Sequence, residues 1–156
     1  MVEARISKRK HVGSEVLLTF WGVRGSIASP GAHTIVFGGN TSCVSLELGN
    51  HIVILDAGSG LRELGRHLMR REEPGPVTAS RVLSHMHWDH MQGLPFFTPG
   101  RVVDNHFTIY GERKCKLSLA EILRRQMQSP YFPVSMETVF QARMKFRQVC
   151  VKHTVE

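Results

Sequence analysis

Residues 81–90 read RVLSHMHWDH, and no other stretch says more about the architecture of this chain. The first four form a short apolar strand that would deliver the next six residues to the edge of a sheet. His85, His87, Asp89 and His90 then offer four potential metal ligands within six residues. Imidazole nitrogen and carboxylate oxygen suit Zn²⁺, Fe²⁺ or Mn²⁺ better than Ca²⁺ or Cu⁺. The alternative, a histidine-rich surface loop, is disfavoured by the position directly after a buried strand.

The spacing of these ligands predicts how they would be shared. Side chains two residues apart in a loop can converge, so His85 and His87 can bind one ion. Asp89 and His90 then point elsewhere and can bind a second ion nearby. Two ions about 3.5–4 Å apart would make a nucleophile of bridging water and stabilise a displaced oxygen.

Around the motif, strand-like and helix-like patterns alternate. Apolar residues at helical spacing predict amphipathic helices over 58–70 and 118–128, the second opened by a capping box of Ser118 and Glu121. Gly49 and Asn50 predict a two-residue hairpin turn. The expected strands are 16–21, 43–48, 51–58, 81–84, 107–111 and 143–151. The fold class is therefore α/β, a layered domain with a mixed sheet.

Length and composition fit one globular domain. The chain has 156 residues, of which 42% are apolar and 21% charged. Residues 1–14 are expected to be a basic flexible arm, with the domain over 15–156. The net charge of +7 would attract phosphate, nucleic acid or an acidic partner, or would simply keep the surface soluble. Three dispersed cysteines and the lack of a signal peptide or membrane span predict a cytoplasmic location.

The motif H-x-H-x-D-H after an apolar strand resembles that of the metallo-β-lactamase-fold hydrolases. The likeness continues through WGVRGSIASPG, FGGNTSCVSLE, ILDAGSGLREL, LSHMHWDHMQGLPFF, IYG and QMQSPYFPVSM, in order over residues ~20–147. These segments are similar to the branch that includes phosphoribosyl 1,2-cyclic phosphate phosphodiesterases. The resemblance implies an αββα sandwich, of which this chain carries the first half, a truncated domain.

The resemblance also implies residue roles. His85 and His87 would bind the first metal and Asp89 and His90 the second, with Asp89 also orienting the attacking hydroxide as a catalytic residue. The expected metal is Zn²⁺, with two ions per site, and Mn²⁺ or Fe²⁺ are alternatives. Asp56, at the end of ILDAG, would support the metal loop, or else act only as a turn or helix-capping residue.

The family completes its site with a further histidine, a bridging aspartate and a last histidine. After His90 this chain has only His106, His153 and Asp104 of those types, and only His153 has a plausible separation for a third ligand. The missing ligands are therefore absent naturally, lost in a fragment, or supplied by another chain. A lone half-sandwich would expose an apolar sheet face, which a homodimer could cover.

Three functions are open as hypotheses. The first is a metal-dependent hydrolase, a phosphodiesterase acting on a phosphate-containing small molecule or nucleotide. The second is a catalytically incomplete remnant or interaction module that retains half of the metal site. The third is an RNA-processing nuclease that uses the basic surface to bind nucleic acid.

Overall fold

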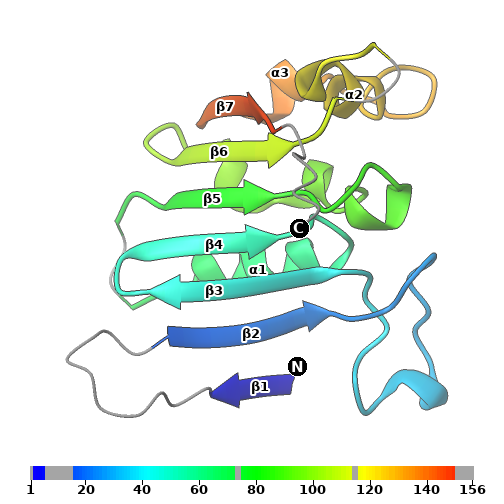
Figure 1. Cartoon of the computed structure of the whole chain (residues 1–156), viewed down its shortest axis with the longest axis vertical. Helices are drawn as coiled ribbons and strands as arrows, with labels where there is room; N and C mark the ends of the chain where they lie inside the picture. The colour runs from blue at the N-terminus through cyan, green and yellow to red at the C-terminus, as the bar shows by residue number, and fades with distance from the viewer. Residues whose placement is uncertain (1, 6–15, 73–74, 114–115, 150–156) are drawn as a thin grey trace, which may run out of the picture.

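The structure, a computed structural model, describes all residues except 1, 6–15, 73–74, 114–115 and 150–156. Seven strands form one sheet in chain order. Their bounds are β1 Val2–Arg5, β2 Val16–Gly22, β3 Cys43–Leu48, β4 His51–Leu55, β5 Thr78–Val82, β6 His106–Gly111 and β7 Arg143–Gln148. The mixed sheet with helices that the sequence predicts is confirmed (Figure 1).

The strands β1 to β4 are antiparallel neighbours. The predicted hairpin joins β3 to β4, with Leu48 opposite His51. Gly49 has a φ of 57°, a left-handed conformation that glycine adopts without steric cost. A turn of two residues fixes the register of β3 against β4, so the apolar residues of the two strands stay on matching faces of the sheet.

The strands β4 to β7 are parallel. Each parallel step needs a crossover, which α1 Gly60–Leu68 provides between β4 and β5. The short 3₁₀ helices η2 Trp88–His90, η3 Leu94–Phe96 and η4 Thr98–Arg101 follow β5, and the helices α2 Leu119–Arg125 and α3 Met136–Val139 follow β6. The carboxyl ends of β4 to β7 therefore meet at one edge of the sheet, where connecting loops can bring side chains together.

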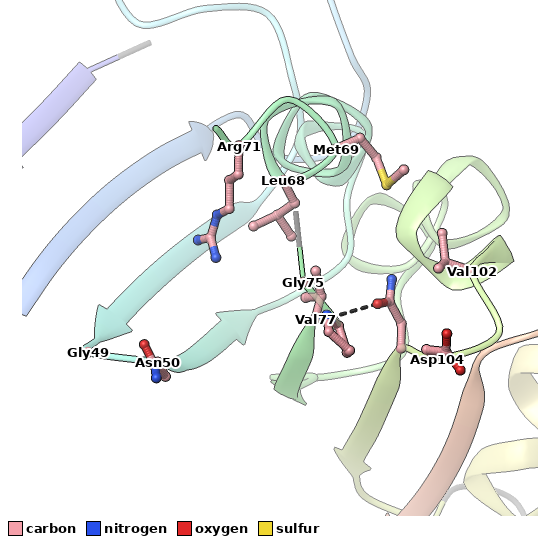
Figure 2. Close-up of a pocket in the computed structure, with 11 residues that line it drawn as sticks. Gly49, Asn50, Leu68, Met69, Arg71, Gly75, Val77, Val102 and Asp104 are labelled. Atoms are coloured by element: carbon pink, nitrogen blue, oxygen red, sulfur yellow. Dashed lines mark hydrogen bonds between the residues drawn. The ribbon is translucent and has the colours of Figure 1, made fainter. Parts of the chain in front are cut away.

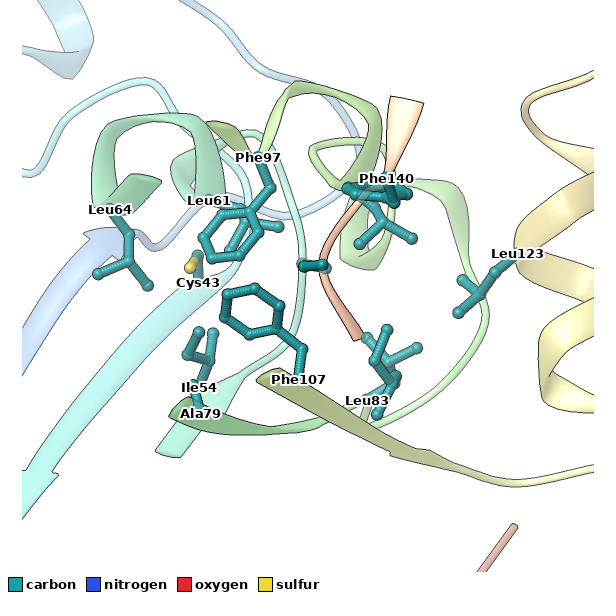
Figure 3. Packing of buried hydrophobic residues seen from close by; sticks show 14 of the residues in the cluster. Cys43, Ile54, Leu61, Leu64, Ala79, Leu83, Phe97, Phe107, Leu123 and Phe140 are labelled. Carbon is teal, nitrogen blue, oxygen red and sulfur yellow. The ribbon is translucent and has the colours of Figure 1, made fainter. Parts of the chain in front are cut away.

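One face of the sheet is buried under these helices. Leu61, Leu64 and Leu68 of α1 are buried against it, as the helical spacing predicts. Phe97 and Phe107 pack edge to face in the same cluster, with ring centroids 5.1 Å apart (Figure 3). This cluster is the hydrophobic core of the described residues.

The described residues place no helix on the opposite face over β2 to β5, where Figure 1 shows α1 behind the sheet. Strand register places a continuous set of apolar side chains there, half-buried or exposed. They are Val16, Leu18, Phe20, Val44, Leu46, Leu48, Val53, Leu55 and Val82. We call this set, together with the outward residues of β5 to β7, the open face.

The structure describes part of the segment expected to be a basic flexible arm at 1–14. Within it, Val2–Arg5 form β1 and pair with Leu17–Phe20 of β2. The physical reason is that β2 would otherwise present an edge of unpaired backbone groups, which an extended segment can satisfy. Residues 6–14 lie outside the described residues. No helix among the described residues has the length and apolar character to cross a membrane.

Candidate metal centre

The motif loop begins where β5 ends. Leu83 still donates its N–H to Tyr110 O at 2.9 Å, so β5 and β6 hold the chain up to the first residue of the loop. His87 then lies in extended backbone, and η2 carries Asp89 and His90. The loop thus stands at an edge of the sheet, as predicted, and the carboxyl ends of the parallel strands form that edge.

Asp56 ties this loop to the end of β4. Its Oδ1 accepts hydrogen bonds at 2.8 Å from the backbone N–H and from the hydroxyl of Ser84. Its Oδ2 lies 2.8 Å from His90 Nδ1 and accepts from the Ser42 hydroxyl at 3.1 Å. Of the two interpretations open from the sequence, support of the motif loop is therefore the one observed.

The imidazoles of the motif lie against one another. The ring of His85 is 4.4 Å from that of His87 and 4.1 Å from that of His90, between centroids. His90 Nε2 is 3.4 Å from Asp89 Oδ2. The structure brings together all four side chains that the sequence singled out, and their role as ligands is a proposal.

The ring nitrogens have distinct surroundings. His85 Nδ1 lies 3.0 Å from the Ser84 hydroxyl, and His90 Nδ1 faces Asp56, so Nε2 of each ring stays outside these two contacts. Among the residues that the structure describes, however, no group of three or more His, Cys, Asp or Glu is arranged to hold a metal ion. The donors are gathered at one edge without converging on one point.

Ser26, in the loop between β2 and β3, explains part of this arrangement. Its N–H donates to Asp89 Oδ2 at 2.8 Å. This hydrogen bond, followed by the charges of His90 and His85, lowers the pKa of Asp89 below its usual value. Asp89 is therefore a carboxylate at neutral pH. Sequence reasoning missed Ser26, since nothing local shows that a residue 63 positions earlier reaches the motif.

Two glycines allow the loops to approach this closely. A Cβ on Gly58 would lie 2.4 Å from Asp89 O, and one on Gly93 would lie 2.0 Å from Gly58 O. The backbone bonds Ala57 N to His90 O, 2.7 Å, and Gly93 N to Ala57 O, 2.8 Å, close the contact. Any side chain at either glycine would push the motif loop away from β4.

The residues around the motif loop differ in their contacts and exposure. Asn40 and Thr41 hold neighbouring loops together: Ser59 Oγ donates to Asn40 Oδ1 at 3.0 Å, and Thr41 Oγ1 accepts from Ser59 N and Gln92 Nε2. Trp88 is 69% exposed, because η2 turns its indole outward.

The other histidine and aspartate after the motif lie elsewhere. His106 begins β6 and Asp104 precedes it, so both belong to the opposite edge of the sheet. Asp104 lines a pocket of about 550 Å³ there, in which Asn105 Oδ1 accepts from Val77 N at 2.7 Å (Figure 2). This pocket is remote from the motif, and His153 lies outside the described residues.

Comparison with known proteins points to one fold. No family model matches the sequence, and no curated protein matches it. Human tRNase Z, short form (ELAC1), is similar in structure, with a TM-score of 0.53 and 21% identity over 84% of this chain and 44% of that one. A diphosphatase of the PhnP family has a TM-score of 0.57 and 15% identity over 87% of this chain and 51% of that one.

A third solved structure, described as a metallo-beta-lactamase from Thermotoga maritima, has 20% identity and covers 63% of this chain and 44% of its own. Its TM-score of 0.39 adds nothing to the assignment. The chain spans about half the length of the solved structures it matches. Its mixed sheet, its helices and these likenesses together show that this chain has the metallo-β-lactamase fold, as a half-domain.

Proposed function

We propose that this chain provides the metal-binding half of a hydrolase that cleaves phosphodiester bonds with a metal-activated water. The observation that carries the proposal is the way His90 is held. Its Nδ1 lies 2.8 Å from the Asp56 carboxylate, and its Nε2 faces Asp89. A histidine fixed through one nitrogen by a carboxylate, with the other left for a ligand, is the arrangement that metal-binding histidines use.

The donor chemistry fits a divalent transition metal. The proposed ligands are His85, His87, Asp89 and His90, and nitrogen donors with one carboxylate favour Zn²⁺, with Mn²⁺ or Fe²⁺ as alternatives. Ser84 beside His85 and Asp56 beside His90 leave Nε2 of both rings for the ion. Because these donors do not converge, binding requires small rotations of the side chains, and we expect weak affinity.

A bound divalent ion would supply Lewis acidity and lower the pKa of water. The chain itself supplies the rest. Asp56 keeps the His90 ring oriented, and the ionised Asp89 accepts a hydrogen bond from the attacking water and aims it at phosphorus. Asp89 is therefore the proposed catalytic residue.

The substrate class is inferred from charge and from the matched proteins. A net charge of +7 favours anionic substrates. The first two solved structures are, by their names, a tRNase and a diphosphatase. We infer that the substrate is a phosphate-containing small molecule or a nucleotide.

A non-catalytic interaction module is the second candidate. It is favoured by the finding that no three donor groups among the described residues form a metal-holding set. In that case the loop would keep its fold through Asp56 without ever loading an ion. The two candidates differ in one measurable quantity, the amount of metal that the chain binds after incubation with Zn²⁺ or Mn²⁺.

The test is metal analysis combined with hydrolysis of bis(p-nitrophenyl) phosphate. The hydrolase predicts about two Zn²⁺ per chain, turnover of the ester, and loss of both in His87→Ala. The matched control is His51→Ala, which removes an exposed imidazole at the hairpin, away from the motif. A metal-free chain without turnover, even after incubation with Zn²⁺ or Mn²⁺, would favour the interaction module.

We also propose that a second copy of this chain covers the apolar part of the open face. The apolar residues on β2 to β4 form a continuous set. Such a surface can pack against the same surface of a second copy in a twofold contact. A partner would also bring a second motif loop into the same assembly.

A further inference from the structure

The edge strand β7 carries a row of cations on the open face. Arg143, Lys145 and Arg147 alternate with Met144 and Phe146, which pack against the hydrophobic core. Alternation in a strand sends the three cations to the opposite side, and all three are exposed. None of them has an ion-pair partner among the described residues.

The neighbouring strand β6 adds polar groups beside this row. Register pairs Arg143 with His106, Lys145 with Thr108, and Arg147 with Tyr110. The open-face positions of β2 to β7 include no aspartate or glutamate. Glu112, directly after β6, has an interaction of its own. The β6–β7 part of the open face is therefore a two-strand strip with cations, a hydroxyl and an aromatic ring.

The direction of the row points to the motif loop. Since β5, β6 and β7 are parallel, Arg147 lies at the same edge of the sheet as the end of β5. Arg147 pairs with Tyr110, and Tyr110 pairs with Val82, three residues before His85. Two strand spacings separate β7 from β5, or roughly 10 Å. A linear anion along β7 would thus have one end close to the His85–His90 cluster.

We propose that the β6–β7 strip binds a single-stranded polynucleotide and guides one of its phosphodiesters to the motif loop. The cleavage step of this proposal rests on the proposed function, whereas the binding step is independent of it. Three cations at a step of roughly 6.6 Å form a line one residue wide, which fits a single backbone. Nonspecific single-strand sites combine such a basic track with an aromatic side chain for base stacking, here Tyr110.

A membrane surface is the other polyanion to weigh. A lipid bilayer is contacted by a broad basic patch or by a basic amphipathic helix. This row is narrow, lies on a strand and runs to the candidate site. These features favour a polynucleotide strand.

The experiment measures fluorescence anisotropy of a labelled oligouridylate of about twelve nucleotides in EDTA, with the full chain. The test variant carries Arg143→Gln, Lys145→Gln and Arg147→Gln. The control carries Arg66→Gln, Arg70→Gln and Arg101→Gln, exposed positions on the helix side that change the net charge equally. We expect the test variant to bind at least tenfold more weakly and the control to stay within about twofold.

Salt dependence adds a second readout. Losing three phosphate contacts should reduce the slope of log K against log salt by about 2, at about 0.7 per contact for single strands. Equal weakening in the two variants, no oligonucleotide binding, or binding only to anionic phosphatidylserine vesicles would each overturn the proposal. Retained hydrolysis of bis(p-nitrophenyl) phosphate in the test variant separates this failure from failure of the hydrolase itself.

Discussion

At the scale of single residues, Asp56 organises the candidate site. One carboxylate joins Ser42, directly before β3, to Ser84 and His90 of the motif loop. Its φ of 62° is a conformation that aspartate tolerates better than most residues. The site is therefore held together by contacts that exist before any ion binds.

The buried Arg81 of β5 is the residue that fits its surroundings least. It is 1% exposed, and its three guanidinium nitrogens have no hydrogen-bond partner among the described residues. Its carbon Cζ lies 4.5 Å from the centre of the Phe97 ring, and burial lowers its pKa to about 10. Nearby, burial raises the pKa of the Cys43 thiol to about 12, which leaves it protonated and non-nucleophilic.

Replacing Arg81 by methionine should stabilise the fold. Burying a cation without hydrogen bonds destabilises the fold by more free energy than its cation–π contact with Phe97 contributes. Methionine keeps most of the side-chain volume without the charge. We expect Arg81→Met to raise the free energy of unfolding by about 1–4 kcal/mol in urea denaturation. Arg101→Met, at an exposed position, is the control and should change it by less than about 0.5 kcal/mol. Destabilisation by Arg81→Met would mean that the guanidinium has a partner in solution.

At the scale of elements, α2 begins as its sequence predicts. Ser118 Oγ accepts from the Glu121 N–H at 3.2 Å, and the Glu121 carboxylate accepts from Ser118 N at 2.7 Å. The capping box is thus complete, and the helix buries Leu119 and Leu123 in its first turns. Local chemistry alone determines where this helix starts.

The charge of Glu121 should make α2 sensitive to acid. The side chain and N–H of Ser118 hold the pKa of Glu121 below its usual 4.5. A lowered folded-state pKa stabilises the fold above 4.5, and this contribution disappears as the pH falls through the lower folded value. Thermal melts should show wild type more stable than Glu121→Gln at pH 7, with the gap closing below 4.5. A gap that does not change with pH would contradict this account.

At the scale of the whole molecule, the open face has two chemically different parts. Its β2–β4 part is apolar, and its β6–β7 part is basic and polar. In a twofold contact two like-charged rows would repel, so the basic strip would lie at the rim and stay accessible. The two proposals for this face are therefore compatible.

The dimer proposal makes a direct prediction about mass. Leu46 lies between Leu18 and Val53 in the apolar part, so Leu46→Glu would place a charge at the centre of the contact. Light scattering after size exclusion should show a dimer for wild type and a monomer for Leu46→Glu. The control Ile35→Glu changes an exposed apolar residue in the β2–β3 loop and should stay dimeric. A monomeric wild type at high protein concentration would refute the proposal.

Local sequence predicts the elements and the motif. Alternation, helical spacing, the Gly49–Asn50 turn and the capping box act over a few residues, so the hairpin, α1, α2 and the strands β2 to β7 result from them. Strand β1 is not among the elements that these local signals predict. The motif loop after β5 is predicted for the same reason. The observed boundaries differ from the predicted ones by a few residues. Strand β5, for example, is predicted at 81–84 and begins at Thr78 in the structure.

Tertiary contacts determined the rest, because they join residues that no local pattern connects. The contact between Asp56 and His90 spans 34 positions, and that between Ser26 and Asp89 spans 63. The outward position of Trp88 and the burial of Arg81 depend on which face each element presents. The cation row of β7 reaches the motif edge only because three strands, separated by crossovers, run parallel in one sheet.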